Sequence, residues 1–381
     1  MWQSAQAHTS TEGAVYIRYL PMRVSGCDDR EDRARVAQDE RRARHLVTVV
    51  IPCRDEESAI EGCLRGVQTQ DWPSDQLEIL VADGMSIDAT REILARLAAE
   101  DNRIVLIDNP ARVRAAGLNE CIRRARGDVL VRIDVQGEYA RDLVRKCVEV
   151  LDRTGADNVG GAATPKARTF FERCVAATLK SPLGVGVVQE HKSRAESEIE
   201  SVWRGAFRRE VFDRVGTFDP GAIAHEDAEL NERIVEAGGR VYMSPDIVVH
   251  YYPRDSIRAL ARQYFKFGQG RARTLLKHGL KHGRFRSWRP LVPFVWLASE
   301  ALLLATTPWQ PFGPWSLATY ALVTGAEAVR VGHREGVLGI AVVWSIFPVL
   351  HVSHGVGFAV GLARYAVRPD WPQEQRLVRA F

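Results

Sequence analysis

Four apolar runs in the first part of the chain, each followed by polar residues, constrain the fold more than any other feature. They span residues 46–52, 77–82, 103–108 and 129–133, and stretches with helical character separate them. Strands buried on both faces of a parallel sheet read as continuous apolar runs. Strands that alternate with helices at this spacing indicate βαβ units, so the sequence predicts an α/β fold with a mostly parallel sheet.

Acidic residues follow three of these runs, at the places where the strands should end. Asp55 and Glu56 follow the first run, Asp83 the second and Asp134 the fourth. In open α/β sheets ligands bind beyond the carboxyl ends of the strands. Asp134 could hold Mg²⁺ against a diphosphate, and Asp83 could accept hydrogen bonds from a nucleobase. Turn formation and a favourable helix dipole explain the same residues equally simply, and the residues alone leave both explanations open.

A second acidic group, His225-Glu226-Asp227, precedes apolar positions with helical spacing, so both carboxylates should lie in a first helical turn. They either complement the helix dipole or provide a base aimed into a site. Around this helix the sequence predicts strands at 157–162, 201–210, 240–244 and 247–251, a helix at 169–181 and a loop over the site at 184–197.

Composition excludes several classes of protein. With 26% charged and 46% hydrophobic residues, the 381-residue chain is neither a disordered protein nor a transporter with many spans. The net charge of +4 comes from dispersed Lys and Arg residues, so no nucleic-acid partner is expected. Six cysteines without C-x-x-C spacing indicate reduced thiols of a cytosolic domain. Residues 1–45 carry mixed charge and no signal-peptide core, and we predict a flexible tail there.

The last ninety residues contain three apolar segments, 291–307, 315–329 and 336–362, each close to the roughly 17–25 residues that cross a bilayer. Arginines before the first segment and after the second place both ends in the cytosol. These two segments should enter the membrane and return, while the third either crosses it or turns back at Pro348. A buried soluble helical bundle is the alternative. The basic, aromatic stretch 255–277 predicts a helix that lies on a membrane or on an ordinary protein surface.

Taken together, four motifs in register resemble glycosyltransferase family 2, and most closely its succinoglycan-type branch of bacterial exopolysaccharide glucosyltransferases. The motifs lie at 47–56, 81–90, 132–134 and 225–227. The resemblance implies a GT-A fold at 46–277, followed by a membrane-associated helical region at 278–381. It also implies a nucleotide-diphosphate sugar donor, most simply a UDP-sugar, and inversion at the anomeric carbon.

The resemblance implies roles for Pro52, Asp55, Glu56, Asp83, Asp134 and Asp227, and the charged and aromatic residues around these motifs suggest the others. Asp227 would be the catalytic base with Glu226 beside it, and Mg²⁺ or Mn²⁺ would bind Asp134, Gln136 and His250. Gln136 departs from the family, which usually has an acidic residue at this position. The donor-binding residues would be Pro52, Asp55, Glu56, Asp83, Arg112, Arg132 and Arg204. The residues that face the acceptor or the membrane would be Trp203, Gln263, Tyr264, Lys266 and Arg271.

These observations predict an inverting glycosyltransferase with a cytosolic catalytic domain at the cell membrane and a polyprenyl-diphosphate-linked glycan as acceptor. Because Gln136 carries no charge, a catalytically weak nucleotide-sugar-binding scaffold of a polysaccharide assembly complex is the alternative. A processive synthase is disfavoured, because residues 263–267 do not match the Gln-x-x-Arg-Trp signature of such enzymes.

Overall fold

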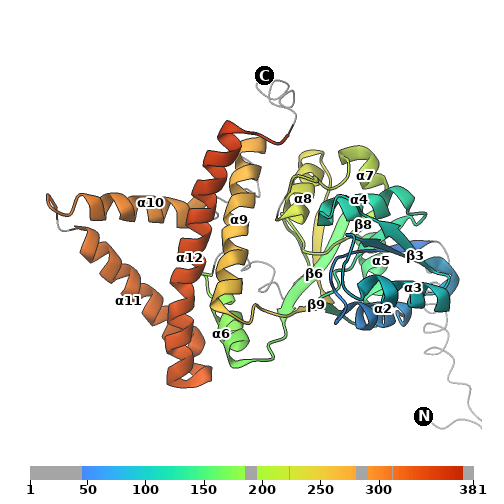
Figure 1. Cartoon of the computed structure of the whole chain (residues 1–381), viewed down its shortest axis with the longest axis horizontal. Helices are drawn as coiled ribbons and strands as arrows, with labels where there is room; N and C mark the ends of the chain where they lie inside the picture. The colour runs from blue at the N-terminus through green and yellow to red at the C-terminus, as the bar shows by residue number, and fades with distance from the viewer. Residues whose placement is uncertain (1–44, 185–194, 223, 280–290, 311, 372–381) are drawn as a thin grey trace, which may run out of the picture. The chain divides into compact units, whose positions relative to one another are not determined.

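The computed structural model describes residues 45–184, 195–222, 224–279, 291–310 and 312–371 (Figure 1). The predicted N-terminal tail up to residue 44, most of the predicted loop 184–197 and the arginines at 284–289 lie outside these residues.

One sheet forms the centre of the region from residue 45 to 251. In the described part of the chain its strand order is β3-β2-β1-β4-β8-β6-β9-β5, with β7 also paired to β9. β1 to β4 run parallel to one another, and β6 runs parallel to β9. β8 is antiparallel to both β4 and β6, and β5 and β7 are antiparallel to β9. The prediction of a mostly parallel α/β sheet is confirmed. The strands are β1 Val47–Cys53, β2 Leu77–Asp83, β3 Ile104–Asp108, β4 Val129–Arg132, β5 Gly137–Tyr139, β6 Asn158–Pro165, β7 Ser197–Glu198, β8 Ala206–Arg208 and β9 Val241–Tyr251.

Helices cover both faces of the sheet because successive side chains of each strand alternate between the faces. Val47, Val49 and Ile51 of β1 pack with α2 (Ile60–Gln68), α3 (Thr90–Glu100) and α5 (Leu143–Thr154). Val50 faces the other way, toward α4 (Arg114–Arg124), α7 (Glu210–Val215) and α8 (Glu226–Glu236). Five cysteines of the described part are free and buried, as predicted, and Cys27 lies outside it.

Two strand predictions are wrong in detail. The strand expected from residue 201 begins only at Ala206, because Arg204 adopts a φ of 55°, which no strand accommodates. The two strands expected at 240–251 are the single strand β9, whose register against β6 shifts between Gly160 and Ala162. Only glycine fits at position 161, where a Cβ atom would collide with the carbonyl oxygen of Ile247.

The C-terminal part is helical and packs on itself through a separate apolar cluster. Buried residues of α6 (Phe170–Leu179), α9 (Ile257–His278), α11 (Phe312–Gly332) and α12 (Gly336–Val367) form this cluster. α9 and α12 lie side by side (Figure 1). α12 continues as a helix through Pro348, so the chain does not turn back at that residue.

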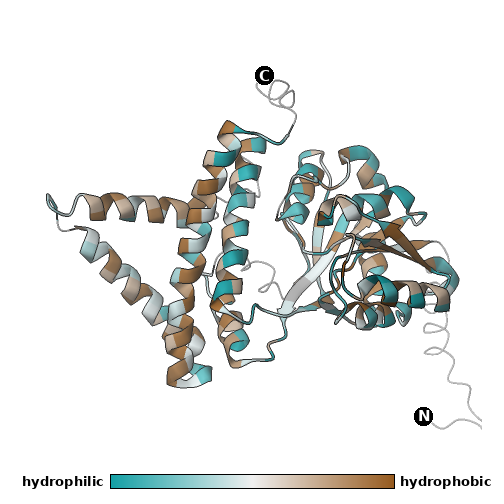
Figure 2. Cartoon of the chain, in the orientation of Figure 1, coloured by the Kyte–Doolittle hydropathy of each residue, from teal (hydrophilic) through white to brown (hydrophobic). Residues whose placement is uncertain are grey.

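Apolar side chains dominate α10 (Val292–Ala305), α11 and α12 (Figure 2). By length and composition alone, one helical stretch of the described chain, Phe312–Val367, could cross a bilayer, while α10 is apolar but shorter. Many large side chains of this region are exposed, among them Trp315 and Leu322 of α11 and Trp309 in the link before α11.

Candidate catalytic site

The loops after β1 and β2 bind each other through polar contacts. The backbone N–H of Asp55 donates to Ser86 Oγ at 2.8 Å, and Asp55 Oδ1 accepts from the N–H of Ile87 at 2.9 Å. The N–H of Glu56 donates to Thr90 Oγ1 at 2.8 Å. The two acidic strand ends are therefore fixed relative to each other at one edge of the sheet.

Asp83 is buried beneath these loops and already has several partners. Its carboxylate accepts from the backbone and hydroxyl of Ser86 and from Arg91, whose guanidinium also binds Asp108 at 2.8 Å. Sequence reasoning missed Arg91, because an arginine in the first turns of a helix carries no signal of its own. A base bound at Asp83 would meet this guanidinium as well.

Asp134 lies just beyond β4 and is surrounded by positive charge. Its Oδ1 accepts from Arg132 Nε at 3.0 Å, and its Oδ2 accepts from Arg204 Nε at 3.1 Å. The hydroxyl of Tyr139 bonds both the N–H and the carbonyl of Asp134. Burial alone would raise the pKa of Asp134, but Arg132, Arg204 and Arg114 together hold this pKa well below its ordinary value.

Glu226 and Asp227 open α8, as predicted, and both are buried. Arg132 Nη2 donates to Glu226 Oε1 at 2.9 Å, and Nη1 donates to Asp227 Oδ1. Burial and the neighbouring carboxylates of Glu226 and Asp134 outweigh the opposing effect of Arg132, and together they raise the pKa of Asp227 to about 6. The pKa of Glu226 is lowered, because Arg132 and Arg114 outweigh its burial.

Arg132 is the residue that joins the two acidic groups. Its side chain is 1% exposed and contacts three carboxylates, so it lies beneath the site and not at the surface where a donor would bind. This corrects the expectation that Arg132 contacts the donor. Arg132 is the last residue of the buried strand β4, and an arginine is almost never fully buried unless it is paired. The exposed residue Arg114, which the prediction omitted, reaches Glu226 at 3.4 Å, whereas the predicted Arg112 is exposed in the turn before α4.

The backbone around the site is strained. Five non-glycine residues of the described chain have φ between 52° and 64°: Asp55, Met85, Arg112, Arg204 and His225. All five lie in the segments that supply the predicted site. Such conformations persist only where the surrounding structure holds them, and they concentrate at functional sites.

The three predicted metal ligands do not form a ready-made metal site. Both oxygens of Asp134 bind arginines, the Gln136 amide donates to the carboxylate of Glu56 at 3.2 Å, and His250 lies opposite Glu138 in the sheet. In the described part of the chain no three His, Cys, Asp or Glu side chains are grouped to hold an ion.

The predicted acceptor-side residues separate into two groups. Trp203 lies at the site, with the guanidinium of Arg204 3.7 Å from its ring centroid and Tyr251 packed edge-on at 5.5 Å. Tyr264, in contrast, is 2% exposed inside the α6–α9–α12 cluster, so it cannot face an acceptor. Along α9, Lys266 is exposed, Arg271 is half-buried, and Gln263 accepts from Arg254 at 3.3 Å.

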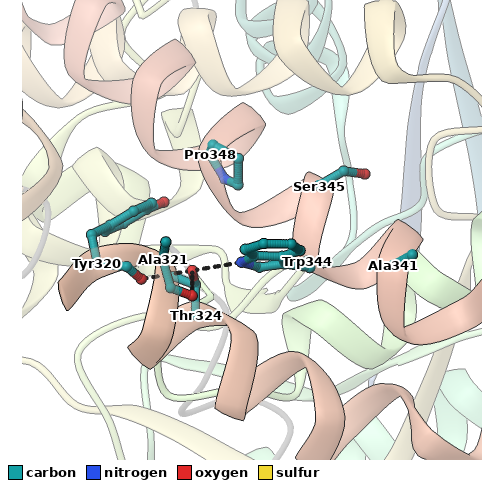
Figure 3. A pocket seen from close by; sticks show the side chains of 7 residues that line it. All are labelled: Tyr320, Ala321, Thr324, Ala341, Trp344, Ser345 and Pro348. Atoms are coloured by element: carbon teal, nitrogen blue, oxygen red, sulfur yellow. Dashed lines mark hydrogen bonds between the residues drawn. The ribbon is translucent and has the colours of Figure 1, made fainter. Parts of the chain in front are cut away.

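A cavity of about 240 Å³ lies elsewhere, between α11 and α12 (Figure 3). Its polar groups already have partners: Trp344 Nε1 donates to Thr324 at 3.1 Å, and the hydroxyl of Tyr320 bonds His351, outside the lining, at 2.8 Å. Its lining is therefore suited to apolar contents and not to the nucleotide of a donor. The lining residues are Tyr320, Ala321, Thr324, Ala341, Trp344, Ser345 and Pro348.

Comparison with known proteins agrees with this geometry. The family model described as glycosyl transferase family 2 matches residues 48–216. The chain is 34% identical to the succinoglycan biosynthesis protein ExoA of Rhizobium meliloti over 81% of this chain and 93% of that protein. It is 24% identical to a Methanococcus voltae enzyme, dolichyl N-acetyl-α-D-glucosaminyl phosphate 3-β-D-2,3-diacetamido-2,3-dideoxy-β-D-glucuronosyltransferase, over 61% of this chain and 75% of that one.

Among solved structures, a mannosyltransferase from Pyrobaculum calidifontis, determined with GDP-Man and Mn²⁺, superposes with a TM-score of 0.55. The match has 23% identity and covers 84% of this chain and 87% of that one. The fold is thus that of a GT-A glycosyltransferase. By its similarity to ExoA over most of its length, the chain belongs to glycosyltransferase family 2.

Proposed function

We propose that this enzyme moves a sugar from a nucleotide-diphosphate donor to a lipid-linked glycan at a membrane, with inversion at the anomeric carbon, in the synthesis of a polysaccharide. The observation that carries the proposal is the buried Asp227, held by Arg132 within a group of charges that also contains Asp134. A carboxylate whose pKa is raised toward neutrality is a better general base than an ordinary aspartate.

In the proposed reaction, Asp227 takes the proton of an acceptor hydroxyl. The oxygen of that hydroxyl attacks the anomeric carbon from the face opposite the diphosphate, and the bond between this carbon and the diphosphate oxygen breaks. Negative charge then develops on the leaving diphosphate. Arg204 and Arg114 lie around Asp134 and supply positive charge there.

A divalent cation, Mg²⁺ or Mn²⁺, belongs to the proposal as an ion that arrives with the donor. Mg²⁺ is usually held by one or two carboxylates together with substrate phosphates, and Asp134 is the carboxylate placed for it. When bound, such an ion neutralises the diphosphate. Titration of the full chain with UDP, GDP and dTDP, with and without Mn²⁺, measures the effect of the ion on nucleotide affinity. We expect Mn²⁺ to tighten binding in the wild type and not in Asp134→Asn, and equal effects in both would remove Asp134 from this role.

Three features support a membrane location and a lipid-linked acceptor. Large apolar side chains of α10, α11 and α12 are exposed, and the cavity between α11 and α12 has an apolar lining. Arg258, Arg262 and Lys266 are exposed on α9, where anionic headgroups would attract them. The M. voltae relative is named for an acceptor on dolichyl phosphate. The ExoA relative is named for succinoglycan biosynthesis, which supports a role in exopolysaccharide assembly.

The decisive assay offers UDP-, GDP- and dTDP-sugars to the full chain in the presence of membrane lipid extracts. We expect one donor class to give transfer to lipid, and Asp227→Asn to abolish this transfer while nucleotide affinity is kept. Near-normal turnover by Asp227→Asn would show that another residue is the base.

The scaffold alternative rests on Gln136, which leaves the site without the usual second acidic ligand. The two functions differ in donor hydrolysis, since even a slow transferase cleaves its donor in the presence of Mn²⁺. Donor binding without any hydrolysis or transfer would favour the scaffold.

A further inference from the structure

We propose that the apolar C-terminal tail, which comprises α10, α11 and α12, helps to position the catalytic base. α12 contacts α9, and α9 in turn contacts the segment around α8, the helix that carries Asp227, at two separate points. The inference rests on the proposed role of Asp227 as the base. It gives the tail a positioning role in addition to membrane attachment.

The first connection is a close crossing of α9 and α12. A Cβ atom on Gly268 of α9 would collide with the carbonyl oxygen of His354, and one on Gly357 of α12 would collide with the carbonyl oxygen of Phe265. The two backbones are therefore in direct contact, and neither helix can shift against the other without losing it. Interiors packed this closely transmit displacement instead of absorbing it.

The same turn of α9 touches the segment that begins α8. The ring of Phe267 lies 4.4 Å from the ring of His225, and a Cβ on Gly270 would lie 2.9 Å from the carbonyl oxygen of Ala224. Residues 267–270 of α9 thus lie between the His354 turn of α12 and the start of α8.

His225 depends on this packing for its conformation. It is the N-cap residue of α8 with a φ of 64°, its side chain makes no capping hydrogen bond, and its buried Nε2 has no partner in the described chain. A left-handed residue of this kind persists only when its surroundings hold it. Because Glu226 and Asp227 follow directly, the orientation of both carboxylates depends on His225.

The second connection is a chain of ion pairs. Asp370, just after α12, accepts from Arg273 Nε of α9 at 2.7 Å, and Arg273 is 2% exposed. Arg273 also binds Asp219 at 2.8 Å. Lys277 binds Asp219 at 2.6 Å and Glu229 of α8 at 2.7 Å.

The two connections flank the base, since His225 lies two residues before Asp227 and Glu229 lies two residues after it. Displacement of α12 should therefore rotate or loosen the first turn of α8. The donor loops after β1 and β2 make their contacts with each other and should not respond.

The test compares Gly268→Ala and Asp370→Asn with matched controls in the full chain. Gly325→Ala places the same methyl group in α11, where the nearest atom is 3.7 Å away, and Arg330→Gln removes the exposed partner of Glu327 in α11. For Gly268→Ala we expect kcat to fall on the order of tenfold to a hundredfold with nucleotide affinity unchanged, as a misplaced catalytic group would cause. Asp370→Asn should lower kcat less, and both controls should behave as wild type.

Hydrogen–deuterium exchange of peptides from 224–236 provides a readout that does not depend on activity. We expect Gly268→Ala and Asp370→Asn to speed exchange there and not in β1 or α2. If Gly268→Ala fails to fold, Asp370→Asn decides, because it introduces no collision. Unchanged exchange in α8, or an equal loss of nucleotide affinity and kcat, would overturn the positioning role. An inactive wild type with faster exchange in the variants would instead count against the proposed function alone.

Discussion

Arg132 donates a hydrogen bond of 2.9 Å to Glu226, which lies 94 residues further along the chain. The same buried guanidinium contacts Asp134 and Asp227, so one cation compensates three carboxylates. A buried charge is tolerated only when it is paired in this way. The proposed base and the residue proposed to face the diphosphate therefore share one partner, and their ionisation is linked.

Replacement of Arg132 should destabilise the protein more than replacement of an exposed arginine would. Arg132→Met removes the one cation that three buried carboxylates share, and we expect a loss of about 3–5 kcal/mol in the free energy of unfolding. Asp134 would still bind Arg204, and Glu226 would still have Arg114 within reach. The control Arg124→Gln removes an exposed pair with Glu120 and should cost at most about 0.5 kcal/mol. Urea unfolding of both variants measures the difference, and equal midpoints would contradict the buried network.

The rate of sugar transfer should fall on acidification at a higher pH than it would if the base were an aspartate with an ordinary pKa. Because the pKa of Asp227 is raised to about 6, its carboxyl holds a proton below that pH and cannot act as a base. We therefore expect kcat/KM to rise with pH through about 6. Arg114 lowers this pKa, so Arg114→Gln should move the acid limb to higher pH, whereas Arg123→Gln, whose side chain pairs with Glu120, should not. An acid limb near pH 4 in the wild type would contradict the raised pKa of Asp227.

Gly137 should be intolerant of a side chain because it makes room for two groups that hold Asp134. A Cβ atom there would collide with the guanidinium of Arg204 and lie 2.5 Å from the hydroxyl of Tyr139. We expect Gly137→Ala to displace Arg204 from Asp134 and to raise KM for the donor on the order of tenfold to a hundredfold, as loss of a charge-assisted contact of about 1.5–3 kcal/mol would do. Gly62→Ala, with nothing within 4 Å of the added Cβ, is the control and should leave KM unchanged.

The tail should bind bilayers through its exposed aromatic residues. Trp309 and Trp315 are 82% and 70% exposed at the junction of α10 and α11, and tryptophan favours the interface of a membrane. We expect the Trp309→Ser, Trp315→Ser double variant to float less with vesicles of anionic lipid than the wild type, with an unchanged unfolding temperature. If both proteins float equally, these side chains do not contact the bilayer. Removal of the whole tail is a poorer test, because it would also expose the faces of α6 and α9 that α12 covers.

The sheet region and the positions of its acidic residues could be predicted from the order of the amino acids. The apolar runs became β1 to β4, the segment at 226–236 became α8, and the residues 55, 83, 134 and 227 lie at strand ends or in a first helical turn. These features follow from local periodicity, which a single sequence displays directly. The family motifs likewise depend on residue order and spacing alone.

Which charged side chains form ion pairs with each other depends on the tertiary structure. The burial of Arg132 beneath Asp227, the approach of Arg91 to Asp83 and the contact of α12 with α9 join residues that are not neighbours on any one element. Sequence placed Arg132 and Tyr264 at ligand-facing positions, and the fold buried both. Local pattern cannot predict such outcomes, because the cost of burying a charge or a ring depends on the partners that packing supplies.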